Sequence, residues 1–142
     1  MNRAYSEAKP VNALNQAATL TGTTTGNIID MQGYQEALII VHVGTATTAD
    51  GSNYFTVSLT HSDDSGMSGE ETVTASNGLL GANLVINATT DANKVAKLGY
   101  NGGKRYIRLA ATETGTASVQ IAAAGVLLRP AHAPVSNSDL TS

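Results

Sequence analysis

The chain has no cysteine and no tryptophan, and its 142 residues include only three prolines and one phenylalanine. The absence of cysteine excludes a disulfide framework and thiolate metal sites, and it suits folding in a reducing cytoplasm. Aromatic residues make up only 4% of the chain, against 42% for all hydrophobic residues, so aliphatic side chains must build the core. A chain of this length fits one domain, which buries roughly 68–70% of its unfolded surface.

Charged residues are also scarce. The 8 Lys and Arg against 11 Asp and Glu give a net charge of −3, and the basic residues are scattered. Because nucleic-acid binding needs a basic stripe, we expect no nucleic-acid partner. No run reaches the ~18 apolar residues of a membrane span, and residues 1–16 lack the apolar centre of a secretory signal. We therefore expect neither a membrane partner nor export.

Alternating apolar and polar residues predict strands along most of the chain. In residues 53–62, Phe55, Val57 and Leu59 share one face, while tyrosine, threonine and serine share the other. The apolar run at 37–43 is too short for a typical helix and rich in branched side chains. The remaining strands are expected at 18–25, 71–75, 82–89, 94–100, 104–112 and 116–129.

Glycines and turn residues separate these segments. The stretch 44–53 is expected to be a loop with a turn at Asp50-Gly51, and Asn101-Gly102-Gly103 predicts a tight hairpin turn. Gly125, inside the last strand, predicts a bulge or a bend.

About eight strands, with turn signals at roughly 8–12-residue spacing, are typical of an all-β sandwich. Since each strand has one apolar face, two antiparallel sheets should pack against each other. We predict an antiparallel β-sandwich, jelly-roll-like or Greek key, over residues 18–129.

Residues 1–17 and 130–142 are polar and contain all three prolines, and Pro10 limits any helix near the start to a turn or two. We expect extended N- and C-terminal arms, too poor in apolar surface to settle on their own domain. Neighbouring subunits would then hold them.

One cluster resembles catalytic chemistry. His61, Ser62, Asp63 and Asp64 place a base, a hydroxyl and two carboxylates together. Catalytic triads, however, are assembled from distant segments around an oriented nucleophile. A capped turn is the expected structure, so we expect neither catalytic residues nor enzyme activity.

Metal sites are weakly indicated. Asp63, Asp64, Glu70 and Glu71 could line a calcium site, but their spacing differs from that of an EF-hand, and a solvated acidic loop is the alternative. His42, His61 and His132 lie far apart, and their spacing suggests no zinc site. We expect no metal and no cofactor.

The only basic concentration is the strongest candidate for a contact surface. In the alternating segment 104–109, Tyr106 and Arg108 should point away from Ile107 and Leu109. Tyr and Arg are enriched at interfaces, although a solubilising face is the alternative. With the C-terminal exit, the candidate interface residues are Tyr106, Arg108, Lys104, Arg105, Arg129, Pro130, His132 and Pro134.

Four segments resemble a family of small tailed-phage virion proteins. They are SLTHSDDS at 58–65, KLGYNGGKRYIRL at 97–109, TGTA at 114–117 and GVLLRPAHAPV at 125–135. They keep the order of the family, whose motifs are structural rather than catalytic, while residues 1–35 match nothing comparable. Relatives tend to carry a second basic residue between the proline and the histidine of the fourth segment, Pro130 and His132, where this chain has Ala131.

The resemblance implies a capsid decoration, or cement, protein of a double-stranded DNA bacteriophage. Such a protein binds the outer surface of the head and reinforces contacts between major capsid subunits. The implied partners are the major capsid protein and further copies of this chain, as a dimer or trimer. The implied location is the virion surface after assembly in the host cytoplasm. A neck, tail or baseplate component and a carbohydrate-binding β-sandwich module remain alternatives, although without tryptophan the second has few aromatic platforms.

Overall fold

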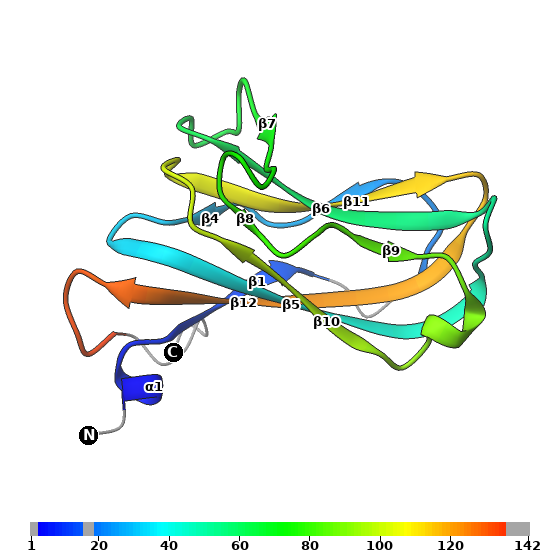
Figure 1. Cartoon of the computed structure of the whole chain (residues 1–142), viewed down its shortest axis with the longest axis horizontal. Helices are drawn as coiled ribbons and strands as arrows, with labels where there is room; N and C mark the ends of the chain where they lie inside the picture. The colour runs from blue at the N-terminus through cyan, green and yellow to red at the C-terminus, as the bar shows by residue number, and fades with distance from the viewer. Residues whose placement is uncertain (1–2, 16–18, 136–142) are drawn as a thin grey trace.

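The computed structural model describes residues 3–15 and 19–135. Within those ranges the chain forms two six-stranded antiparallel sheets that pack face to face, as Figure 1 shows. Among the described residues, helical structure is limited to α1 (Arg3–Ser6) and a short 3-10 helix, η1 (Thr89–Asp91). The expected all-β sandwich is confirmed.

Each sheet has long central strands and short outer ones. Sheet A has the order β1 (Lys9–Leu14), β12 (Ser118–Pro130), β5 (Tyr34–Thr48), β10 (Val95–Tyr100) and β8 (Leu79–Leu80), and β2 (Thr19–Leu20) also pairs with β12. Sheet B is centred on β11 (Tyr106–Thr114) and β6 (Tyr54–Ser62). Its outer strands are β3 (Thr24–Thr25) and β4 (Ile29–Asp30) beside β11, and β7 (Glu71–Thr72) and β9 (Leu84–Ile86) beside β6.

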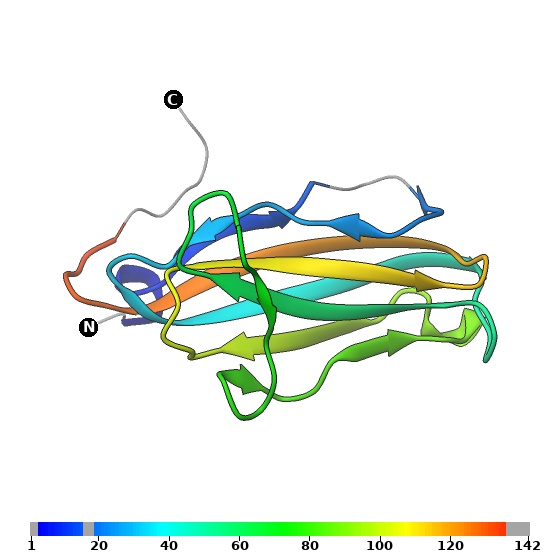
Figure 2. The same ribbon diagram turned by 90° about the horizontal axis from the view of Figure 1, so that it is seen from above.

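Connections between long strands cross from one sheet to the other. β5 leads to β6, β10 to β11 and β11 to β12, and each pair is divided between sheets A and B (Figures 1 and 2). The expected hairpin turn at Asn101-Gly102-Gly103 is therefore wrong, because β10 pairs with β5 and β11 pairs with β6. The segment links the two layers of the sandwich instead.

The core lies between the sheets and is almost entirely aliphatic. Phe55, Val57 and Leu59 of β6 are fully buried, as their alternation predicts, and so are Ile107 and Leu109 of β11. Ile39, Val41, Val119 and Ile121 face them from sheet A. Tyr100 is the largest fully buried side chain.

The N-terminal segment differs from the expected arm. Residues 9–14 form β1, which pairs with β12 and buries Ala13 and Leu14. Pro10 is tolerated there because β1 is an edge strand, where one N–H is not needed for pairing.

The C-terminal segment leaves the sandwich at Pro130, the last residue of β12. The Ala131 N–H donates to Gly33 O at 2.8 Å, and the Val135 N–H donates to Ser6 O at 3.0 Å. The start of the expected C-terminal arm thus contacts its own chain, near α1. Residues 1–2, 16–18 and 136–142, which include parts of both expected arms, lie outside the described residues.

Gly125 does not form the expected bulge. It pairs in regular register with Ile39 of β5 and Val11 of β1. A Cβ at this position would lie 2.8 Å from Val11 Cγ2 and 3.0 Å from Ile39 Cδ1. Gly125 therefore leaves room for the close packing of neighbouring side chains.

Candidate functional site

The outer face of sheet A carries aliphatic side chains across five neighbouring strands. In one row, Ala124 of β12 pairs with Ile40 of β5, and Ile40 pairs with Lys97 of β10. In the next, Val126 pairs with Leu38, and Gly99 links Leu38 to Leu80 of β8. We call this surface the apolar face; its members are Pro10, Leu38, Ile40, Leu80, Val95, Ala122, Ala124, Val126 and Leu128.

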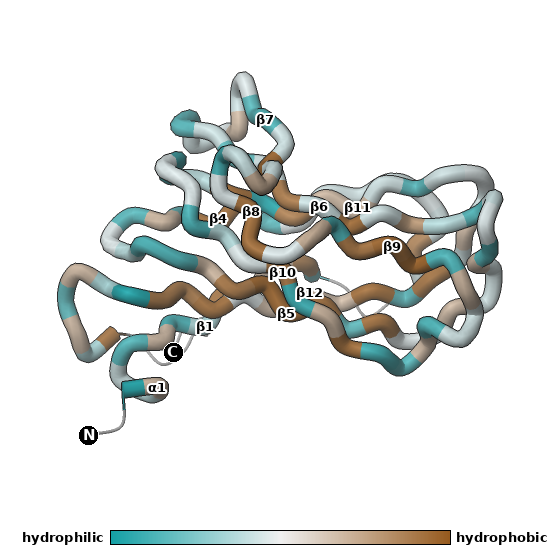
Figure 3. The backbone as a smooth tube through the Cα atoms, in the orientation of Figure 1, coloured by the Kyte–Doolittle hydropathy of each residue, from teal (hydrophilic) through white to brown (hydrophobic). Residues whose placement is uncertain are grey.

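Several of these side chains are open to solvent. Val95 is 64% exposed, Leu80 46% and Ile40 37%, while Leu38, Val126 and Leu128 are half-buried. Figure 3 shows hydrophobic residues gathered where β5, β10 and β12 lie side by side. In an antiparallel sandwich the outer face is usually polar, because water covers it.

A hollow in the apolar face lies over Gly99. It has a volume of about 310 Å3, and its lining includes Leu38, Leu80 and Leu128 as well as Glu36 and Lys97. Glu36 is paired with Arg129 at 3.3 Å. An apolar hollow beside a few charged groups is typical of a protein contact surface.

The outer face of sheet B has the opposite character. Tyr54, Thr56, Ser58 and Thr60 alternate along β6, and their partners on β11 include Thr112, Thr114 and Arg108. Hydroxyl and charged groups suit contact with water. The outer surface of sheet B is therefore mostly polar, with the exposed Val85 beside Thr56 as an exception, whereas that of sheet A is mostly aliphatic.

The candidate residues of segment 104–108 lie on the sheet B side, and their charges are paired. Lys104 Nζ lies 2.8 Å from Asp63, and Arg105 makes two 2.9 Å hydrogen bonds to Asp30. The Arg105 guanidinium also lies over the Tyr106 ring, 5.0 Å from its centre. These contacts hold the crossing connection 101–105 against its neighbours.

Arg108 projects from β11 near the start of the strand, and its guanidinium binds the Glu70 carboxylate, with Nε 3.0 Å from Oε2. The Thr60 hydroxyl donates to the same carboxylate at 2.7 Å. Together they hold the pKa of Glu70 below its ordinary value, with Arg108 the larger cause.

The other candidates lie at the exit of β12. Arg129 and His132 are exposed, Pro130 is half-buried and Pro134 is exposed. The turn at 31–35 lies between this exit and the connection that carries Lys104 and Arg105. The turn and that connection together line a hollow of about 530 Å3. The structure thus brings both groups to one end of the sandwich, on either side of that turn (Figure 1).

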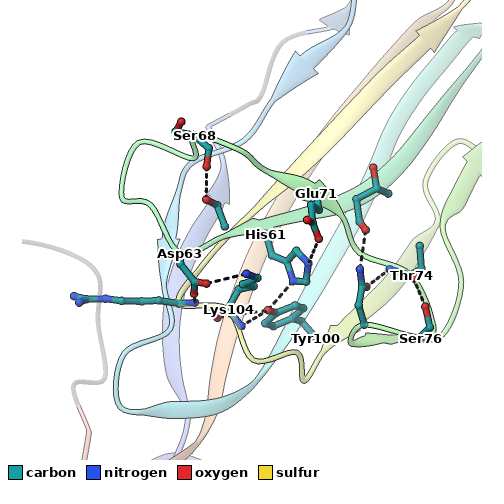
Figure 4. A network of polar contacts seen from close by, with 12 residues as sticks. His61, Asp63, Ser68, Glu71, Thr74, Ser76, Tyr100 and Lys104 are labelled. Atoms are coloured by element: carbon teal, nitrogen blue, oxygen red, sulfur yellow. Dashed lines mark hydrogen bonds and ion pairs between the residues drawn. The ribbon is translucent and has the colours of Figure 1, made fainter.

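A polar network lies at the same end (Figure 4). His61 Nδ1 is 2.9 Å from the Tyr100 hydroxyl, which accepts a 3.1 Å hydrogen bond from the Lys104 N–H. His61 Nε2 has no hydrogen-bond partner among the described residues, and Glu71 Oε2 lies 3.9 Å away. Burial lowers the pKa of His61 and raises that of Tyr100.

The neighbouring residues 62–64 form the expected capped turn. The Ser62 hydroxyl donates to Ser68 O at 2.7 Å and accepts from the Asp64 N–H at 3.0 Å. The Asp64 carboxylate accepts from the Gly66 and Ser68 N–H groups. The prediction of a capped turn is confirmed, and the Ser62 hydroxyl is bonded to the turn rather than to His61.

The acidic residues of this region point to different partners. Asp63 binds Lys104, Asp64 caps the turn, Glu70 binds Arg108, and Glu71 lies beside His61. Across residues 3–15 and 19–135, no group of three or more His, Asp or Glu is placed to hold a metal ion.

Sequence reasoning missed the apolar face. The signal was present, because residues 37–43 and 121–128 are apolar on both faces of their strands. In an antiparallel sheet such a run indicates either burial on both sides or an apolar surface that a partner covers.

No family model matches the chain, and no curated protein matches it significantly. Among the residues that the structure describes, no helix is both long and apolar enough to span a membrane.

Proposed function

We propose that this chain is a capsid decoration protein of a tailed bacteriophage, which binds the outer surface of the head and reinforces contacts between major capsid subunits. The apolar face is the observation that carries the proposal. Contiguous apolar patches on soluble proteins mark surfaces that other molecules cover. The four segments that resemble phage virion proteins supply the biological setting.

In this role the apolar face lies against the capsid shell or against a neighbouring copy, while the polar face of sheet B meets water. Each contact adds a modest amount of binding free energy. Many copies on one lattice add their contacts, so that avidity exceeds the affinity of a single copy.

The segments that resemble phage proteins have a structural role in this arrangement. Segment 58–65 contains His61 and Asp63, and segment 97–109 contains Tyr100 and Lys104. These are the residues that tie β6, β10 and the crossing connection together. They stabilise the sandwich itself, and surfaces such as the apolar face make the contacts with the capsid.

The test is co-sedimentation of the full chain with purified tailed-phage heads that lack it. We expect the wild-type chain to bind, and the double variant Ile40→Lys, Val126→Lys to lose binding because charge replaces two members of the apolar face. Ser58→Lys is the matched control, since Ser58 lies on the outer face of sheet B. Circular dichroism checks that all three remain folded.

Loss of binding by Ser58→Lys together with retained binding by the double variant would show that sheet B is the contact surface. Absence of wild-type binding would contradict the decoration role. Copy number in purified virions then separates it from a neck, tail or baseplate role, because those components occur in few copies at one vertex.

A further inference from the structure

The outer edge of β10 is covered along only part of its length. β8 pairs with β10 at Gly99 and Tyr100 alone. Over Val95–Leu98, no strand among the described residues pairs with β10 on that side. Sheet A therefore ends there in an open edge.

The hydrogen-bond pattern identifies the groups that this edge presents. The Val43 N–H donates to Lys94 O at 2.8 Å, so in an antiparallel ladder Ala96 and Leu98 direct their N–H and C=O groups toward β5. The N–H and C=O groups of Val95 and Lys97 point away from β5, toward the open edge. The Asn101 N–H, which donates to Gly78 O at 2.9 Å, continues the same outward side.

An apolar cleft lies next to this open edge. It has a volume of about 260 Å3, lies between β10 and β9, and is lined mainly by Val41, Val43, Leu84, Ile86 and Ala96. β9 pairs with β6 on its other side. Figure 1 shows the two strands in different layers of the sandwich, with β9 in sheet B and β10 in sheet A. The cleft thus lies at the margin of the core, where Val41, Val43 and Ile86 are buried.

These features define the chemistry of an occupant. Outward N–H and C=O groups on Val95 and Lys97 call for another extended backbone, as in recognition by strand addition. The cleft calls for aliphatic side chains at alternate positions of that strand. Both requirements are met by one polypeptide segment that lies along β10.

The local charges select its remaining side chains. Lys94 is paired with Asp91 at 3.0 Å, whereas Lys97 has no ion pair among the described residues. Lys97 lies on the outer face of sheet A, because it pairs with Ile40. A carboxylate on the outward face of the added strand would complement it, since opposite charges on neighbouring strands attract.

The same lysine argues against a second copy of β10 as the occupant. Two β10 strands paired about a two-fold axis would bring two Lys97 side chains close together. Lysines on edge strands commonly prevent such self-pairing. The edge therefore favours a different, acidic polypeptide.

We propose that the cleft between β9 and β10 binds an extended segment of a different polypeptide as an added strand of sheet A, with small aliphatic side chains in the cleft and an acidic residue beside Lys97. The inference is independent of the capsid role, because any protein with such a segment meets its requirements.

The probe is the peptide acetyl-Ser-Val-Asp-Val-Thr-Val-Ser-amide, titrated into the full-length chain and followed by NMR amide exchange. At saturation, exchange of the Val95 and Lys97 amides should slow by at least about tenfold, because both gain hydrogen bonds. Amides of β11, in the other sheet, should not change. A peptide with Lys in place of Asp is the matched control and should bind more weakly.

Val95→Pro tests the edge directly. It removes an N–H that β5 does not use, and proline is tolerated at such edge positions. The variant should keep the exchange protection of Leu98 and lose peptide binding. If it does not fold, Lys97→Glu provides the second test, and it should prefer the Lys peptide over the Asp peptide.

Three results would overturn the proposal. The first is that millimolar peptide leaves the amide exchange of Val95 and Lys97 unchanged in the folded protein. The role of Lys97 would then be to prevent pairing between two copies of β10. The second is slowed exchange that depends on protein concentration without peptide, which would make a second copy the occupant. The third is peptide binding that Val95→Pro and Lys97→Glu leave unchanged, which would place it elsewhere.

Discussion

The Nδ1 atom of His61 lies 2.9 Å from the hydroxyl of Tyr100, and the two rings meet edge to face at 89°. His61 belongs to β6 of sheet B and Tyr100 to β10 of sheet A, so this contact joins the two layers inside the sandwich. Both side chains are buried. A buried histidine that joins two sheets should make stability depend on pH.

Acidification should destabilise the protein in the range where unfolded histidine titrates. Burial lowers the pKa of His61 below its ordinary value of 6.5, and the nearby Glu71 carboxylate only partly offsets this effect. The unfolded chain therefore binds the proton more readily than the folded one. Stability should fall as the pH drops below 6.5, until the folded-state pKa is reached, with a slope of at most about 1.4 kcal/mol per pH unit.

Urea unfolding from about pH 7.5 to about pH 5 measures this dependence. His61→Phe should remove the slope in that range, whatever it does to stability at neutral pH. His42→Gln is the matched control, because His42 is exposed on the outer face of sheet A. Equal slopes for wild type and His61→Phe would contradict the prediction.

Two adjacent glycines should respond differently to substitution by alanine. A Cβ on Gly102 would lie 2.6 Å from Asn77 O and 2.6 Å from the Tyr100 hydroxyl, whereas a Cβ on Gly103 meets nothing within 4 Å. Gly102→Ala should therefore cost about 1–3 kcal/mol, as overpacking does, and Gly103→Ala should change stability by less than about 0.5 kcal/mol. Chemical denaturation compares the two, and equal effects would show that the crossing connection can shift.

The ion pair of Arg108 with Glu70 should contribute measurably but modestly to stability. Arg108→Met should cost about 0.5–1 kcal/mol, less at high salt, because both side chains are partly solvated. Since Arg108 lowers the pKa of Glu70, this contribution is present above pH 4.5 and is lost as the pH falls through the folded-state pKa. A double-mutant cycle with Glu70→Gln isolates the coupling. A coupling free energy of zero would show that the ion pair does not stabilise the fold, so that Arg108 could instead contact a partner.

The period-two strands were predictable because burial on one face determines their pattern. The inward residues of β6 are those that alternation selects, Phe55, Val57 and Leu59. In segment 104–109, Ile107 and Leu109 are likewise buried while Arg108 lies on the surface. Such strands need no knowledge of their partners.

Strand limits and connections depend on distant residues and were harder to predict. β5 continues through Thr48 because Ala46 and Thr48 pair with β12, far along the chain. β1 forms in a polar segment because β12 offers an open edge and the core accepts Leu14. Gly102-Gly103 serves a hairpin and a crossing between sheets equally well, so the local sequence does not distinguish them.

The adjacent residues Ile39 and Ile40 provide a matched test of the apolar face. Ile39 points into the core and is fully buried, whereas Ile40 points outward and pairs with Ala124 and Lys97. Ile39→Ala should cost about 2–5 kcal/mol because it leaves a cavity. Ile40→Ala should stay within about 0.5 kcal/mol of wild type.

Changes at Ile40 should affect association with a partner more than changes at Ile39 do. Ile40→Lys should weaken any self-association or capsid binding, because it introduces a charge that a partner would have to desolvate without compensation. Sedimentation velocity at several concentrations, alongside thermal unfolding, separates the two effects. If Ile40→Lys destabilises the isolated protein as much as Ile39→Ala does, the outer face of sheet A must already be covered within its own chain. If it leaves both stability and association unchanged, the contact surface lies elsewhere on the sandwich.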